Sequence, residues 1–216
     1  MHGVATMNAG RIGSKRPLSK NWGYDRGTPI DRFYIEDFLA AHRSDIRGQV
    51  LEVQEDDYSR RFGGSAVTGQ DVLNLDASNP KATIIGDLSD PATLPRAKFD
   101  CIVLTQTLHL VFDMAAAIAN VRQALRPGGV LLITVPGITP LQPGLDYDWY
   151  WSLTEDSLRR LLAGSFDPSK VKLKTYGNLF AATAFLHGAA VQEVPRRKLT
   201  RFDPAYPVTV AARAVA

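Results

Sequence analysis

The hydrophobic positions of the chain follow two different spacings. From Ile30 to Leu39, apolar side chains recur every three or four residues after Thr28 and Pro29, which predicts an amphipathic helix ending near His42. Beyond it, short apolar runs typical of buried strands alternate with segments of helical spacing. The predicted strands cover residues 49–53, 65–73, 82–85, 99–104, 130–135, 171–176 and 208–212, and the further predicted helices cover 115–125, 152–163 and 179–187.

Strands that are apolar on both faces and alternate with helices indicate an open α/β fold with a mostly parallel sheet. Residues 1–20 show no periodicity, and they carry four cationic side chains and no acid. We therefore expect residues 1–20 to form a disordered basic tail and residues 21–216 to form a single domain.

The net charge of the chain is interpreted differently once its distribution along the sequence is considered. The formal net charge of +3 comes from 25 Lys and Arg against 22 Asp and Glu, and the predicted tail accounts for the whole excess. A nearly neutral body makes nucleic acid an unexpected partner. No apolar run is long enough for a signal peptide or a membrane span, so we expect a cytoplasmic protein without a membrane partner. The single cysteine, Cys101, lies in an apolar run and is expected to be a buried thiol.

Acidic residues stand at or near the ends of the predicted strands. Glu52, Asp71 and Asp87 would lie at the carboxyl edge of a parallel sheet, where ligands bind in open α/β folds. A carboxylate there can accept hydrogen bonds from both hydroxyls of a ribose or from the exocyclic amine of adenine. Each acid alone could be a helix cap or a turn residue, but together they favour a nucleoside site.

Four segments in order resemble the core of class I S-adenosylmethionine-dependent methyltransferases. They are VLEV at 50–53, VTGQDV at 67–72, IIGDLSDPATLPRAKFDCIVLTQTLHLVFD at 84–113 and LRPGGVLLITVPG at 125–137. The resemblance implies a Rossmann-like, mostly parallel sheet of seven strands with helices on both faces and the last strand antiparallel. It also implies S-adenosyl-L-methionine as the cofactor and S-adenosyl-L-homocysteine as the product.

The matched segments imply which residues bind the cofactor. They are Glu52, Val53 and Gln54 beside the methionine portion, Asp71 and Val72 at the ribose hydroxyls, Asp87 and Leu88 at the adenine, and Thr105 and Gln106 in the wall after the fourth strand.

The loop after the first strand departs from the family pattern. Family members usually have a glycine-rich loop there, whereas residues 54–58 read QEDDY and the next glycine is Gly63. Three consecutive acids exclude a phosphate cradle and suit a cationic sulfonium cofactor better. The same loop leaves open a catalytically silent domain that binds a nucleoside or a partner.

Methyl transfer to a hydroxyl group requires alignment of the reacting atoms and removal of one proton. His109 is the first candidate for the base, because it follows the fourth predicted strand and imidazole titrates near neutral pH. Its alternative role is packing at a helix start. Asp146 and Asp148 are the second choice for the base. The candidate contacts of the methyl acceptor are Asp31, Tyr34, Tyr147 and Trp149.

The histidines lack the spacing of metal ligands, and the acids at 55–57 are interpreted as a solvated turn, so no metal is expected. The segments NWGYDRGTPIDRFYIEDFL, YWSLTEDSLRRLL and YGNLFAATAFLHG resemble methyltransferase domains that accompany glycosyltransferases. That resemblance implies O-methylation of a small polar metabolite such as a sugar or a glycosylated natural product. The alternative is N-methylation of an aminosugar, for which Glu55, Asp146 and Asp148 could hold the ammonium group. We expect a monomer or a homodimer.

Overall fold

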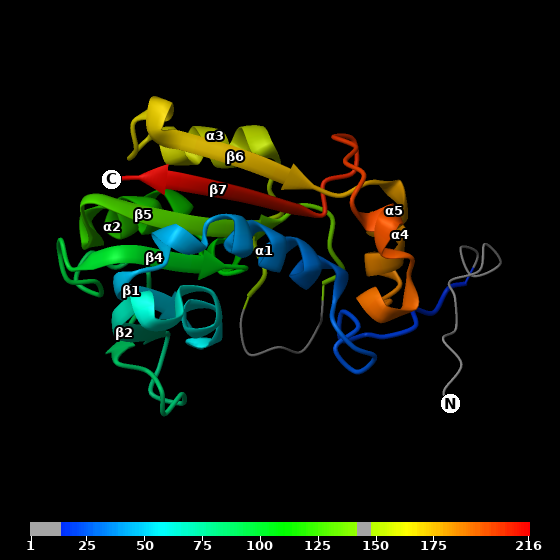
Figure 1. Cartoon of the computed structure of the whole chain (residues 1–216), viewed down its shortest axis with the longest axis horizontal. Coiled ribbons are helices and arrows are strands. Elements are labelled where there is room, and N and C mark those ends of the chain that lie inside the picture. Colours follow the sequence, from blue (N-terminus) through cyan, green and yellow to red (C-terminus); the bar gives the residue numbers. More distant parts are fainter. Residues whose placement is uncertain (1–13, 142–147) are drawn as a thin grey trace.

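The computed structural model describes residues 14–141 and 148–216. Its centre is a seven-stranded sheet with the order β3-β2-β1-β4-β5-β7-β6 (Figure 1). The strands are β1 Gly48–Val53, β2 Val67–Asn74, β3 Ile84–Ile85, β4 Phe99–Thr105, β5 Leu125–Pro136, β6 Val171–Tyr176 and β7 Thr209–Val215. β7 is antiparallel to β5 and β6, and the other pairs are parallel, which confirms the predicted sheet.

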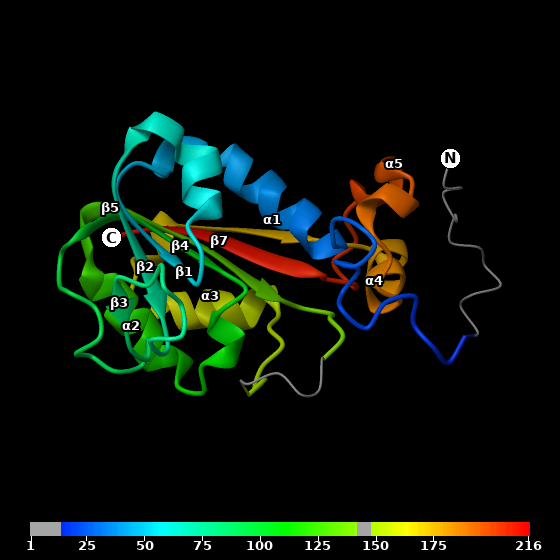
Figure 2. The same cartoon turned by 90° about the horizontal axis from the view of Figure 1, so that it is seen from below.

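Helices cover both faces of this sheet (Figure 2). The α-helices are α1 Ile30–Ala41, α2 Met114–Ala124, α3 Glu155–Ala163, α4 Leu179–Leu186 and α5 Arg196–Leu199. α2 and α3 share one buried cluster with Leu51, whereas α1 and α4 share the other with Val50 and Cys101. Because neighbouring residues of β1 face opposite clusters, the sheet is buried on both sides, and Cys101 is fully buried as predicted.

The helix starts follow from capping residues in the sequence. Asp113, Thr154 and Asn178 accept a hydrogen bond from the backbone N–H three residues on, at the start of α2, α3 and α4 respectively. α1 begins directly after Pro29, which is its N-cap residue with an extended ψ of 150° and makes no side-chain cap.

The region after β1 and β2 differs from the predicted pattern. The connections 75–83 and 86–98 form turns without an α-helix, and a short π-helix at Ser59–Gly63 follows β1. β2 continues to Asn74, so that Asp71 is paired with Leu51 inside the strand and does not end it. The predicted strand, residues 65–73, ends within one residue of β2, but the expectation that Asp71 stands at its end is wrong.

Residues 18 and 19 lie in the predicted basic tail, and the structure gives them contacts with the rest of the domain. The backbone N–H groups of Leu18 and Ser19 donate to the carbonyl of His187 at 2.7 and 3.3 Å, so this part of the predicted tail packs against the end of α4. In the described part of the chain, no helix combines the length and the apolar character needed to cross a bilayer.

Candidate active site

A cavity of about 220 Å³ lies where the carboxyl ends of β1, β4 and β5 meet the first turn of α1. Its polar lining includes Asp31 and Arg32 of α1, Gln54 directly after β1, and Gln106 and His109 directly after β4. This edge of a parallel sheet is the usual ligand site of open α/β folds. The cavity thus unites Asp31, Gln54, Gln106 and His109 from the predicted site residues.

Strained backbone is concentrated around this cavity. Trp22, Gln54 and Gln106 have φ angles of 50°, 66° and 48°, and they are three of the four non-glycine residues with positive φ in the described chain. All three line the cavity. A left-handed conformation costs a residue with a side chain about 1–2 kcal/mol and is retained mainly where function requires the geometry. The strain therefore marks this cavity as the candidate functional site.

His109 presents an imidazole with unused hydrogen-bonding capacity. The side chain is 2% exposed, and its Nδ1 atom is buried without a hydrogen-bond partner among the described residues. Burial, and secondly the charge of Arg32, lower the pKa of His109 to about 3. The ring is consequently neutral at physiological pH and retains a lone pair that can accept a hydrogen bond.

Two tryptophans form a flat wall beside His109. The Trp149 ring centroid lies 4.3 Å from that of His109 and 6.3 Å from that of Trp22, whose plane is tilted by only 23° from that of Trp149. Both indole N–H groups are anchored, because Trp22 Nε1 donates to the Pro140 carbonyl at 3.0 Å and Trp149 Nε1 to the Trp151 carbonyl at 3.1 Å. The apolar faces of the rings remain suited to a flat ligand.

Asp31 and Arg32 place opposite charges in the same cavity without pairing closely. Asp31 Oδ2 is 4.0 Å from Arg32 Nε, and that Nε donates to the hydroxyl of Tyr24 at 2.6 Å. Asp31 Oδ1 accepts the backbone N–H of Arg32 at 2.8 Å. Burial raises the pKa of Asp31, and the charge of Arg32 opposes this rise. Both side chains therefore have capacity for charged groups of a ligand.

Glu52 organises the glycine-poor loop that follows β1. The carboxylate is 3% exposed and accepts hydrogen bonds from Ser59 N at 2.8 Å, Ser59 Oγ at 2.7 Å and Tyr58 N at 3.2 Å. Burial raises its pKa to about 6, against the opposing effect of these hydrogen bonds. Glu52 does not line the cavity, so its contribution to the site is to hold the loop that contains Gln54.

Asp71 lies away from the cavity, among partners of its own. Its carboxylate binds Lys98 Nζ at 2.6 Å, Gln49 Nε2 at 2.7 Å and Thr83 Oγ1 at 2.8 Å. Burial acts to raise the pKa of Asp71, but these partners, Lys98 first, lower it below its usual range. Because Lys98 immediately precedes β4, the carboxylate is directed to the amino edge of the sheet. This placement does not support the predicted contact with ribose.

Asp76 occupies the strand-end position that was predicted for Asp71. It follows the last residue of β2 by two positions, and its exposed carboxylate accepts the Ser78 N–H at 2.8 Å. Asn79, in the same loop, donates to the Gln54 carbonyl and so links this loop to the cavity. Asp87 stands at the matching position after β3 and is exposed as well. The signal for Asp76 in the sequence is an acid directly after the apolar Leu75.

Other predicted cofactor contacts lie around the cavity without lining it. Val53 packs against the core, and Leu88 is 5% exposed, with its carbonyl accepting Asn120 Nδ2. Val72 lines a separate surface pocket of about 540 Å³. Thr105 is the last residue of β4, next to Gln106.

The residues predicted to contact the methyl acceptor do not all lie at the cavity. Tyr34 is 2% exposed and its hydroxyl donates to the Leu199 carbonyl at 2.9 Å, so it is a core residue and not a ligand contact. Asp148 is exposed, accepts the hydroxyl of Tyr150 at 2.7 Å and does not line the cavity. Asp146 and Tyr147 lie outside the described residues.

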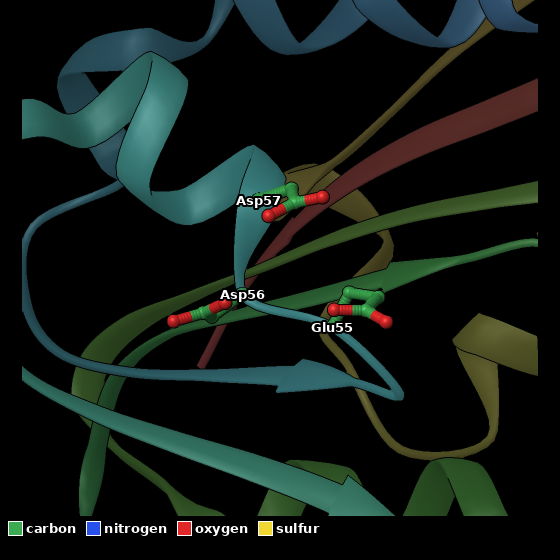
Figure 3. A group of neighbouring side chains, drawn as sticks. All are labelled: Glu55, Asp56 and Asp57. Atoms are coloured by element: carbon green, nitrogen blue, oxygen red, sulfur yellow. The ribbon is translucent and has the colours of Figure 1, made fainter. Parts of the chain in front are cut away.

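Among the described residues, the three acids that follow β1 are close enough together to be considered as ligands of a metal ion. Ligand atoms of Glu55, Asp56 and Asp57 lie within 4.8 Å of one another in the turn that leaves β1 (Figure 3). Lys81 Nζ lies 2.7 Å from Glu55 and 3.4 Å from Asp56, and Arg60 also pairs with Asp56. Cationic side chains thus already compensate this group, and the expectation that no metal binds remains a prediction.

Comparison with known proteins identifies the family to which the chain belongs. Residues 16–167 match the methyltransferase domain family, which is well over half of the chain. The chain belongs to this family. A Mycolicibacterium smegmatis protein named as an S-adenosylmethionine-dependent methyltransferase is 32% identical over 91 residues, which are 42% of this chain and 35% of that protein. The matched region therefore spans about a third of this relative.

Solved structures of methyltransferases share the fold of this domain. A S-adenosylmethionine-dependent methyltransferase from Archaeoglobus fulgidus has a TM-score of 0.56 at 12% identity, covering 86% of this chain and 94% of its own. The cyclase SpnF has a TM-score of 0.54 at 13% identity, covering 84% and 80% respectively. The domain is therefore a class I methyltransferase by family and by fold, and S-adenosylmethionine is the cofactor of that class.

Eight residues that line this cavity were not among the predicted site residues, and three of them come from the chain around the start of α1. Trp22 and Tyr24 come from the loop before α1, and Arg32 comes from its first turn. A signal for Trp22 and Tyr24 is the presence of two aromatic residues among the polar and glycine residues of NWGYDRG. The position of that loop relative to β1 and β4 could not be derived from local spacing.

Proposed function

We propose that the protein transfers a methyl group from S-adenosylmethionine to a hydroxyl group of a small polar metabolite, a sugar or a glycosylated natural product. The observation that carries this proposal is the cavity in which the strained ends of β1 and β4 meet the neutral, incompletely hydrogen-bonded imidazole of His109. Methyl transfer needs such a group where the acceptor hydroxyl loses its proton.

The charged groups at this edge fit the chemistry of the cofactor. S-adenosylmethionine supplies a methyl group activated by positive sulfur, together with an α-amino acid end, a ribose and an adenine. Asp31 and Arg32 would hold the ammonium and carboxylate of the amino acid end in the cavity. Asp76 would accept from the ribose hydroxyls and Asp87 from the adenine amine, because both carboxylates are exposed at neighbouring strand ends.

His109 and the two tryptophans would bind the methyl acceptor. A pyranose ring can stack on the apolar face of an indole, and Trp22 and Trp149 present two nearly parallel faces. His109, 4.3 Å from Trp149 between ring centroids, would accept the proton of a hydroxyl group on that sugar. Its imidazole is neutral before the reaction, but a pKa of about 3 makes it a weaker base than the near-neutral imidazole expected from the sequence. Proton transfer to His109 therefore requires that the bound ligands raise this pKa.

An amine acceptor is the alternative; it would use the Asp31 carboxylate, which lies in the cavity, in place of the proposed contact of Asp31 with the cofactor. Of the acids first considered for this role, Glu55 pairs with Lys81, Asp148 does not line the cavity, and Asp146 lies outside the described residues. Matched pairs of sugars and aminosugars separate the two: an enzyme for amines methylates the aminosugar, whereas an enzyme for hydroxyls methylates the sugar.

Calorimetric titration with S-adenosylhomocysteine tests whether the protein binds the cofactor product, which the proposal requires. We expect one saturable site per chain, and transfer of labelled methyl groups to at least one member of a sugar panel. The cyclase SpnF has this fold, so a folded sheet alone does not decide the activity. Absence of binding at millimolar ligand would contradict the cofactor, and binding without any transfer would favour a catalytically silent domain.

A further inference from the structure

One end of the molecule combines a strong positive charge with exposed apolar side chains. The segments 14–27 and 177–207 contain eight Lys and Arg against three Asp and Glu, whereas the other 171 residues contain 17 against 19. The excess charge of the chain is therefore not confined to a tail. It is concentrated in two segments that are far apart in the sequence, which we call the basic pole.

The structure brings these two segments together. Leu18 N–H donates to the His187 carbonyl, and Arg26 forms an ion pair with Glu193. Asn178 Nδ2 donates to the carbonyls of Lys198 and Arg201, which fixes the end of α5 against the start of α4. Both views show the N-terminal segment, α4 and α5 at the end of the molecule opposite the C-terminus (Figures 1 and 2).

The segment 177–207 of the basic pole also exposes large apolar side chains. Leu179 and Leu186, at the two ends of α4, are 56% and 45% exposed, and Phe202, just after α5, is 49% exposed. The exposed cationic side chains of the pole are those of Lys15, Arg16, Lys20, Arg196, Arg197, Lys198 and Arg201. Cations beside exposed Leu and Phe side chains are typical of proteins that lie on anionic lipid surfaces.

We propose that the basic pole docks on the surface of an anionic lipid bilayer, with its cations at the headgroups and Leu179, Leu186 and Phe202 inserted between them. Binding to a polyanion such as nucleic acid would need the cations but not the three exposed apolar side chains. Phe185 of α4 lines the candidate active-site cavity, so a docked pole would bring this cavity close to the lipid surface. The docking itself does not depend on the proposed function.

The test is sedimentation of the full-length protein with vesicles of phosphatidylcholine alone or mixed with phosphatidylglycerol, at low and high salt. The pole variant is Arg196→Gln with Arg197→Gln and Arg201→Gln. Its matched control, Arg160→Gln with Lys170→Gln and Lys172→Gln, removes the same charge from α3, from the 3₁₀ helix Pro168–Lys170 and from β6. A third variant replaces Leu179, Leu186 and Phe202 by serine and keeps all charges.

We expect salt-sensitive binding to the anionic vesicles only, weakened on the order of 100-fold in the pole variant and little changed in the control. The serine variant should also bind more weakly. The proposal is overturned if the wild-type protein does not sediment with anionic vesicles, or if the pole variant and its control lose equal affinity. Wild-type binding by the serine variant, or binding of duplex DNA without vesicle binding, would likewise overturn it.

Discussion

The surroundings of Asp71 and His109 differ in how completely their polar atoms are hydrogen-bonded. Both side chains are buried, and both were expected at the site. The carboxylate of Asp71 has three partners at 2.6–2.8 Å, whereas His109 Nδ1 has none among the described residues. Native proteins pair nearly all buried polar groups, so a paired one is explained by folding and an unpaired one calls for another explanation. The comparison favours a role in stability for Asp71, and it supports the proposal that His109 serves ligand chemistry because its unpaired atom lies at the cavity.

The largest expected effect is on turnover at His109. His109→Ala removes the proposed proton acceptor, so methyl transfer should fall by roughly two to four orders of magnitude. The affinity for S-adenosylhomocysteine, measured by calorimetry, should change little. The matched control is His187→Ala, because His187 does not line the cavity, and this variant should retain turnover. If the His109→Ala variant kept wild-type turnover, His109 would contribute only to the stability of the fold, as Asp71 does.

The opposite pattern is expected at Asp71. Asp71→Asn weakens three hydrogen bonds of a carboxylate and leaves Lys98 without its ion pair, so the free energy of unfolding should fall by about 3 kcal/mol. Urea titration measures this loss, and calorimetry should find cofactor affinity unchanged in the folded variant. Loss of cofactor affinity without loss of stability would contradict this assignment and would show that Asp71 contacts the cofactor.

The pH dependence of stability provides a third way to separate the two groups. The folded pKa of His109 is about 3, below its usual value of 6.5, so the unfolded chain binds a proton that the folded chain does not as pH falls below 6.5. Folding should therefore lose about 2 kcal/mol between pH 7 and pH 5 relative to His109→Gln. Glu52, with its pKa raised to about 6, acts in the opposite direction but is common to both proteins. Identical pH profiles would contradict a buried neutral imidazole.

The smallest of these effects is expected at the end of β2. Asp76→Asn should weaken S-adenosylhomocysteine binding roughly ten-fold, because a charged acceptor of the ribose hydroxyls is lost. Its stability should be unchanged, since the side chain is exposed. Calorimetry on Asp76→Asn and Asp71→Asn in parallel decides which of the two acids faces the cofactor.

Much of the fold could be predicted from the sequence. Strand β6 at Val171–Tyr176 and helix α4 from Leu179 agree with the predicted bounds, because clear periodicity and the Asn178 cap define them. The place of Asp71 within β2 could not be determined in this way. Asp71 interrupts an apolar run like a terminal acid, and only its pairing with Leu51 of β1 shows that the strand continues to Asn74.

The site was predictable where it follows a strand directly. Gln54, Gln106 and His109 lie next to the ends of β1 and β4, and the cavity unites them. Tyr34 was misplaced because its helical position does not reveal that its hydroxyl reaches Leu199, far along the chain. Trp22 was missed for the same reason, since its contact with Trp149 joins two loops that have no periodicity of their own.

A crystal structure with S-adenosylhomocysteine bound tests the central claim most directly. We predict that the sulfur atom lies in the cavity with Gln54, Gln106 and His109, with the ribose hydroxyls at Asp76 and no contact to Asp71. A ligand bound at Asp71, or one that leaves the cavity around His109 empty, would contradict this assignment of the two regions.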